Sequence, residues 1–252
     1  MTQQEALFRF ALRMGDNTLV LGHRISEWCG HAPVLEEDIA QANIALDLIG
    51  QARNYLSYAG EVEGKGRGED ALAYLRDSRE YINALITEQP KGDFAHTIVR
   101  SFLWDAFHLP LLKAMANSPD ERLKGIAEKA VKEVTYHLRH SSEWLVRFGD
   151  GTGESHDRAQ AALNDLWRFT GELFEADDAE RLLAKAGIIP QLENLKADWN
   201  ATVDRVLKEA TLQRPAGEWM ASGGKHGMHT EHLGLMLAEM QVLQRTHPGA
   251  TW

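Results

Sequence analysis

The chain has 252 residues, of which 44% are hydrophobic and 25% are charged, and its formal net charge at pH 7 is −10. This charge argues against nucleic acid or an anionic membrane as the main partner, because both are polyanions. Cys29 is the only cysteine, so the chain can form neither an intrachain disulfide nor a zinc finger. The N-terminus lacks the basic start and apolar run of a signal peptide, and no apolar stretch approaches the ~20 residues that cross a bilayer. We therefore expect a cytoplasmic protein.

The first part of the chain has the periodicity of long amphipathic helices. Apolar residues recur every three or four positions in four segments, which predicts helices over 5–28, 36–59, 94–116 and about 119–148. Two glycines, Gly15 and Gly22, lie on the apolar face of the first segment and cost roughly 1 kcal/mol each relative to Ala. Their presence predicts the close approach of a neighbouring helix.

The remaining segments are shorter and more varied. Glycine-rich 61–70 predicts an exposed loop, and a shorter helix is expected from Asp70 to about Glu88. Further helical patterns cover 158–174, 175–185 and 191–210, followed by irregular 214–227 and a last helix to about Arg245, with Thr230 as its N-cap. No stretch of five to eight residues alternates as a β-strand should. The sequence therefore predicts an all-α protein.

Two of the predicted helices carry residue pairs at the same spacing on their inward faces. The pairs are Leu48-x-x-Gln51 and Val134-x-x-His137, and residues three apart on a helix share a face. In ferritin-like di-iron bundles the corresponding pairs are Glu and His, which aim a carboxylate and an imidazole at one point in the core. Here aliphatic side chains replace both Glu residues, and they offer no lone pair to iron. The pattern resembles a metal site that has lost most of its ligands.

The same residues also fit an ordinary core in which Leu48 and Val134 pack and His137 is hydrogen-bonded. Asp105 lies between apolar neighbours and is the best candidate for a buried carboxylate. A direct pair between His137 and Asp105 would let a buried charge persist. Such a residual polar pair would be held by its own hydrogen bond or bind a water molecule.

Two patterns near the C-terminus can indicate ligands. His226, His229 and His232 recur every third residue, as metal ligands sometimes do, but the first lies in a glycine-rich loop and the last in a predicted helix. Their relative geometry is therefore unspecified. The run Ser222-Gly223-Gly224-Lys225 can hold a phosphate through backbone N–H groups, although it lacks the full phosphate-loop spacing.

Six stretches carry a resemblance to a known family: Ser26–Pro33, Asn43–Arg53, Glu88–Pro90, Tyr136–Arg139, Leu166–Phe174 and Thr230–Met240. In them the chain resembles the structural subunits of the bacterial multicomponent ring-1,2-phenylacetyl-CoA epoxidases, or phenylacetate-CoA oxygenases, of aerobic phenylacetate degradation. The resemblance implies a ferritin-like four-helix bundle with additional C-terminal helices. We expect one domain over 1–252, with the core bundle at about 5–148 and the helical extension at about 158–245.

The resemblance also implies the partners. A homologous catalytic oxygenase subunit would hold the di-iron centre, other components would include a reductase, and this subunit would carry no cofactor and no catalytic residue. The catalytic relatives have Glu-x-x-His where this chain has Val134 and His137, so their ligands are not carried over. No nucleic acid or membrane is expected to bind.

Phenylacetyl-CoA is expected near the subunit interface, held mainly by the catalytic chain. Two stretches of this chain are candidates to lend contacts, Glu80-Tyr81-Ile82-Asn83 in the predicted short helix and Arg181-Leu182-Leu183 in the acidic segment. Arg181 can meet a phosphate, and Tyr81 and Asn83 can hydrogen-bond the pantetheine arm or stack on adenine.

Two other functions are compatible with the residues alone. The first is a stand-alone ferritin-like di-iron enzyme with an atypical site that uses Asp47, Asp105, His137 and other acids. The second is a helical small-molecule-binding protein that uses the bundle core as a pocket. Iron content of the purified chain distinguishes a di-iron enzyme from a structural subunit. Co-purification with a homologous catalytic chain distinguishes a structural subunit from a small-molecule-binding protein.

Overall fold

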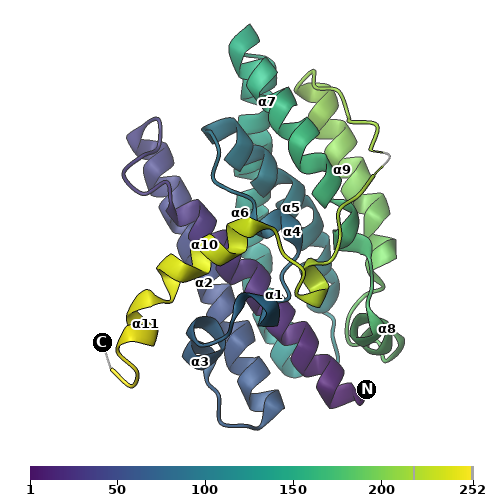
Figure 1. Ribbon diagram of the computed structural model, residues 1–252. Helices are drawn as coiled ribbons and strands as arrows, with labels where there is room; N and C mark the ends of the chain where they lie inside the picture. The colour runs from purple at the N-terminus through teal and green to yellow at the C-terminus, as the bar shows by residue number, and fades with distance from the viewer. Residues whose placement is uncertain (218, 251–252) are drawn as a thin grey trace.

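Four long helices form the centre of the computed structural model, which describes residues 1–217 and 219–250. They are α1 (Gln3–Ser26), α2 (Leu35–Glu63), α5 (Phe94–Met115) and α6 (Glu121–Gly149) (Figure 1). α1 packs along α2, α5 packs along α6, and the two hairpins meet where α2 faces α6. The described residues contain helices and no strand. The predicted all-α fold is confirmed, and each long helix begins and ends within a few residues of its predicted bounds.

The close approach predicted from the glycines of α1 is confirmed. A Cβ built on Gly15 would lie 2.5 Å from Leu56 Cδ2, and one built on Gly22 would lie 3.3 Å from both the Ala45 carbonyl oxygen and Leu48 Cβ. A side chain at Gly15 would displace that of Leu56, and one at Gly22 would press on the backbone of α2. Because glycine has no side chain, these two positions permit tight packing of α1 on α2, at an entropic cost to the helix.

Three further helices cover one side of the bundle. α7 (Gly153–Leu166) and α9 (Leu195–Glu209) pack against α5 and α6, and α8 (Asp178–Lys185) packs against α1 (Figure 1). The helix predicted over 158–174 is wrong beyond Leu166, where two 3₁₀ turns, η2 (Trp167–Phe169) and η3 (Gly171–Phe174), follow. A third 3₁₀ turn, η4 (Leu192–Asn194), precedes α9.

The short helix predicted from Asp70 to about Glu88 is also wrong. The segment instead contains α3 (Glu69–Tyr74), a 3₁₀ turn η1 (Ser78–Glu80), an irregular stretch and one helical turn, α4 (Leu85–Glu88). Side chains of α1 accept its backbone N–H groups: the Ile82 N–H donates to Asp16 at 2.9 Å and the Ala84 N–H to Asn17 at 2.7 Å. These bonds replace the bonds of a continuous helix.

The chain ends in an arm, residues 222–246, that returns to the α1 side of the bundle (Figure 1). Within the stretch predicted to be irregular it contains a 3₁₀ turn, η5 (Gly224–His226). The helices α10 (Glu231–Met240) and α11 (Val242–Thr246) follow and replace the single predicted last helix. Thr230 stands at the N-cap as predicted, but its hydroxyl donates to Glu88 instead of capping the helix. None of the helices described is both long and apolar enough to span a membrane.

Candidate functional site

The two residue pairs of the bundle core point inward, as their spacing predicts. Leu48 and Gln51 on α2 and Val134 and His137 on α6 are all buried. Leu48 packs against Gly22 of α1, so it fills space with carbon where a ligand carboxylate would stand in a metal-binding bundle. These four positions therefore contribute two aliphatic side chains, one imidazole and one amide to the core.

The predicted direct pair between His137 and Asp105 is not what the structure shows. His137 Nε2 lies 3.0 Å from Asp47 Oδ2, on the neighbouring helix α2. Asp47 precedes Leu48 and is therefore turned toward the seam between α2 and α6, where it is part-exposed. The imidazole thus pairs with a hydrated carboxylate at the edge of the core.

Gln51 is also joined across this seam. Its amide Nε2 donates to Glu133 Oε2 at 2.9 Å, so the residue in the position of a ligand histidine makes a structural bridge between α2 and α6. An amide can do this at any ordinary pH because it does not titrate.

Asp105 is buried on α5, where Ser141 Oγ of α6 donates to its Oδ2 at 3.0 Å. Burial raises the pKa of Asp105 to about 7, although the nearby His137 and the Ser141 hydroxyl favour the charged form. Burial therefore favours the protonated form of this carboxyl.

His108, which our sequence analysis missed, is fully buried one turn after Asp105. Its ring packs against Trp104 at 5.1 Å between centroids, with the ring planes tilted by 45°, and within the described residues neither ring nitrogen has a hydrogen-bond partner. Burial lowers the pKa of His108 to about 3, helped by the charge of His137, so the ring is neutral. Its signal in the sequence is Asp105-x-x-His108, the same spacing of three as the other pairs.

These residues do not fit a di-iron centre. Such a centre takes about four carboxylates and two imidazoles from four helices. In the part of the chain that the structure describes, no group of three or more His, Cys, Asp or Glu side chains is placed to hold a metal ion. The core therefore holds a neutral imidazole, a buried carboxyl whose pKa is raised, and one His–Asp pair at its edge.

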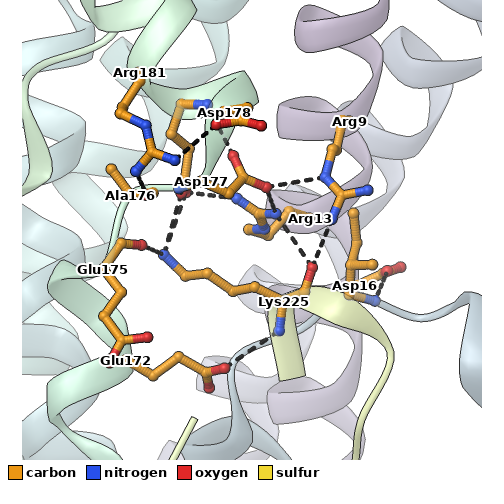
Figure 2. A network of polar contacts seen from close by, with 12 residues as sticks. Arg9, Arg13, Asp16, Glu172, Glu175, Ala176, Asp177, Asp178, Arg181 and Lys225 are labelled. Carbon is orange, nitrogen blue, oxygen red and sulfur yellow. Dashed lines mark hydrogen bonds and ion pairs between the residues drawn. The ribbon is translucent and has the colours of Figure 1, made fainter. Parts of the chain in front are cut away.

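A second polar group, the Arg13 cluster, lies between α1, α8 and the arm (Figure 2). Arg13 Nη2 contacts Asp177 Oδ2 at 2.5 Å and its Nη1 contacts Glu180 Oε1 at 2.7 Å. The arm's Lys225 Nζ donates to the Glu175 carbonyl at 2.7 Å and lies 3.3 Å from Glu180. The cluster comprises three cations, Arg9, Arg13 and Lys225, and three carboxylates, Glu172, Asp177 and Glu180.

The run Ser222–Lys225 binds a carboxylate of its own chain instead of the phosphate considered from its sequence. The backbone N–H of Gly223 donates to Glu172 Oε1 at 2.8 Å, and that of Lys225 donates to the same oxygen at 3.3 Å. Glu172 is buried and occupies the place an external anion would take. No signal in the sequence identifies Glu172 as this partner, because it lies about fifty residues away along the chain.

The three C-terminal histidines do not converge. His226 is exposed, His232 is half-buried at the start of α10, and His229 faces Glu88. The described residues place no metal-binding group of three around them. The spacing of three therefore marks no common site.

The two stretches predicted to contact phenylacetyl-CoA differ in exposure. Tyr81, Ile82 and Asn83 are buried, and Asn83 donates to Glu88 at 2.9 Å, so their surfaces face the protein itself. Glu80 and Arg181 are exposed, Leu182 is half-buried and Leu183 is buried. Figure 2 shows Arg181 turned toward Asp178, at 2.7 Å, and the Ala176 carbonyl. Contact with CoA stays a prediction, and Arg181 is its most accessible candidate.

Comparison with known proteins gives two matches over nearly the whole chain. The sequence profile of a family described as phenylacetic acid catabolic protein matches residues 1–252. The chain is also 52% identical, over 246 residues, to the C component of the 1,2-phenylacetyl-CoA epoxidase of Escherichia coli (strain K12). That alignment covers 98% of this chain and 99% of the relative.

Proposed function

Because the chain belongs to the family of phenylacetic acid catabolic proteins, we propose that it is a non-catalytic structural subunit of a multicomponent phenylacetyl-CoA epoxidase. In this proposal a homologous catalytic subunit binds the di-iron centre and the substrate, a reductase and other components complete the complex, and this chain needs no cofactor. The complex would epoxidise the aromatic ring of phenylacetyl-CoA.

One observation carries the non-catalytic role. Leu48 and Val134 fill the two core positions at which a di-iron bundle needs carboxylates, and both are buried against neighbouring helices. The remaining polar groups, a raised-pKa carboxyl and a neutral imidazole, offer too few hard ligands to offset the dehydration of two iron ions. The chain has the helical bundle but lacks the iron ligands. This combination is expected if its role is to bind a catalytic homologue.

A row of exposed apolar residues on α2 supports the proposal that another protein binds this chain. Leu35, Ile39 and Leu46 are each more than half exposed along the outer face of this helix. A row of large aliphatic side chains in water is a common feature of surfaces that another protein covers.

Co-expression with a homologous chain that has both Glu-x-x-His pairs tests the proposal. We expect the two chains to co-elute in size exclusion at micromolar concentration, with iron in the complex. This chain, expressed alone in iron-supplemented medium, should contain well below one iron per chain. Separate elution, or about two irons per chain with oxygen-dependent turnover by this chain alone, would contradict the structural role.

Arg181→Ala tests the substrate contact. If the guanidinium meets a CoA phosphate in the complex, its loss should raise KM for phenylacetyl-CoA roughly tenfold, the effect of one charge-assisted hydrogen bond. Arg158→Ala is a matched control, since Arg158 is also an exposed arginine held by a nearby carboxylate, Glu154, at 2.6 Å. An unchanged KM in the Arg181 variant would reject the contact and leave the structural role standing.

A further inference from the structure

His229 in the arm has both ring nitrogens facing hydrogen-bond acceptors. Nδ1 lies 2.7 Å from Glu88 Oε2, and Nε2 lies 2.8 Å from the Tyr81 carbonyl oxygen. The His229 side chain is only 5% exposed and that of Glu88 is fully buried. The contact joins the arm to the segment 81–88, which is itself held by α1.

This geometry requires a positive charge on the ring. A neutral imidazole has one N–H donor, whereas the carbonyl of Tyr81 only accepts, and an ionised Glu88 only accepts. The imidazolium form of His229 donates to both Glu88 and the Tyr81 carbonyl. In either neutral tautomer one ring nitrogen has no proton, so one of these two contacts has no hydrogen bond.

The alternative is a neutral His229 that accepts a proton from a protonated Glu88, but both carboxyl oxygens of Glu88 already face other donors. Its Oε1 accepts from the backbone N–H of Thr230 at 2.7 Å and from the Thr230 hydroxyl at 2.8 Å. Its Oε2 accepts from Asn83 Nδ2 at 2.9 Å as well as facing His229. Three donors other than His229 therefore already point at this carboxyl group, and a further proton on it would face one of them.

We propose that Glu88 and the imidazolium of His229 form a proton-dependent latch that fastens the arm to the bundle. When His229 loses its proton, the ring can donate to only one acceptor and the buried Glu88 keeps an uncompensated charge. Lys225 still anchors the start of the arm at Glu175 and Glu180, so release is confined to the part that follows, through α10.

Charged groups on every neighbouring element set the proton affinity of the latch. Asp16 of α1, paired with Arg76, favours the cation, and Arg24 of α1 donates to the backbone carbonyls of Glu88 and His232. The surface pocket beside His229 is also lined by Arg79, His226 and Glu231. Burial lowers the pKa of His229, but the hydrogen bond and charge of Glu88, the Tyr81 carbonyl and Asp16 outweigh it and hold the pKa above its ordinary value.

The direction of the pH dependence follows from this balance. A group whose folded pKa is raised contributes its stability fully below the unfolded pKa and loses it as pH rises through the folded pKa. The latch is therefore closed in mildly acidic solution and weakens as the solution becomes alkaline.

The protonation state is tested by NMR on the full chain with ¹⁵N-labelled histidine. At pH 6.5 both ring nitrogens of His229, assigned by comparison with His229→Gln, should carry protons. A single protonated nitrogen at this pH would overturn the latch. This measurement uses the wild-type chain, so it does not depend on the folding of a variant.

Hydrogen–deuterium exchange tests the release. After correction for the intrinsic pH dependence, protection of amides 228–241 should fall by up to about tenfold per pH unit between the unfolded pKa of histidine, about 6.5, and the folded pKa of His229, and should level off above it. Glu88→Gln and His229→Gln should lose this dependence, while the control His31→Gln, a change at an exposed ring outside the arm, should keep it. Unchanged pH dependence in either latch variant, or pH-independent protection in the wild type, would overturn the proposal.

Discussion

Replacing Arg13 with Met is expected to lower the free energy of unfolding by about 3–5 kcal/mol, the cost of leaving a buried charge unpaired. The guanidinium is 2% exposed and contacts Asp177 and Glu180, which are almost equally buried. Burial raises the pKa of Asp177, but the hydrogen bond and charge of Arg13 hold it below its usual range. Without Arg13 the cluster has three carboxylates and two cations, so one buried negative charge is uncompensated.

Arg9→Met is the matched control for this change. Arg9 Nε contacts the same Asp177 Oδ2 at 2.9 Å, but its side chain is 32% exposed, so water screens the pair and its loss should cost at most about 1 kcal/mol. Urea unfolding followed by circular dichroism at pH 7 measures both variants. If Arg13→Met unfolds within about 1 kcal/mol of the wild type, the cluster contributes little net stability.

The long helices could be predicted because each buries one continuous face. In α2 the residues at helical spacing along one face, Ile44, Leu48, Gln51, Tyr55 and Tyr58, are all buried. Burial of one stripe imposes the helical period on the sequence, and that period can be recognised without knowing what the stripe packs against. The glycines of α1 added one tertiary feature, the close approach of α2.

The segment 70–88 could not be predicted, since distant residues decide its backbone. Its N–H groups at Ile82, Ala84 and Leu85 donate to Asp16, Asn17 and Glu172 respectively. These acceptors lie more than sixty residues away in sequence, and local helix propensity contains no information about them. Asp16 and Asn17 also break the apolar pattern of α1 for the same reason.

The core site was predicted in position but not in its pairing. The spacing of three placed Gln51 and His137 correctly on inward faces, because residues three apart share a face in any helix. Which carboxylate meets His137 depends on the rotation of α2 against α6, and that rotation turns Asp47 into the seam. Asp105 is left with a hydroxyl as its partner instead.

Asp105→Asn is expected to stabilise the chain progressively as pH rises. The pKa of Asp105 is about 7 in the folded chain and about 4 in the unfolded chain, so unfolding releases a proton between these values. The native carboxyl therefore costs stability at a slope of about 1.4 kcal/mol per pH unit from about pH 4 to 7, and the cost is constant above that. Asparagine keeps an oxygen that can accept from Ser141 but does not ionise.

The measurement is the difference in unfolding free energy between Asp105→Asn and the wild type, at pH 5 and at pH 8. Subtraction removes the other titrating groups, and the difference should shift in favour of the variant by about 2–3 kcal/mol over this range. Asp157→Asn, at a side chain that is 87% exposed, should show no such shift. Equal differences at both pH values for Asp105→Asn would mean that the carboxylate is already ionised in the core at pH 5, so that the protein compensates a buried negative charge and burial does not keep the group neutral.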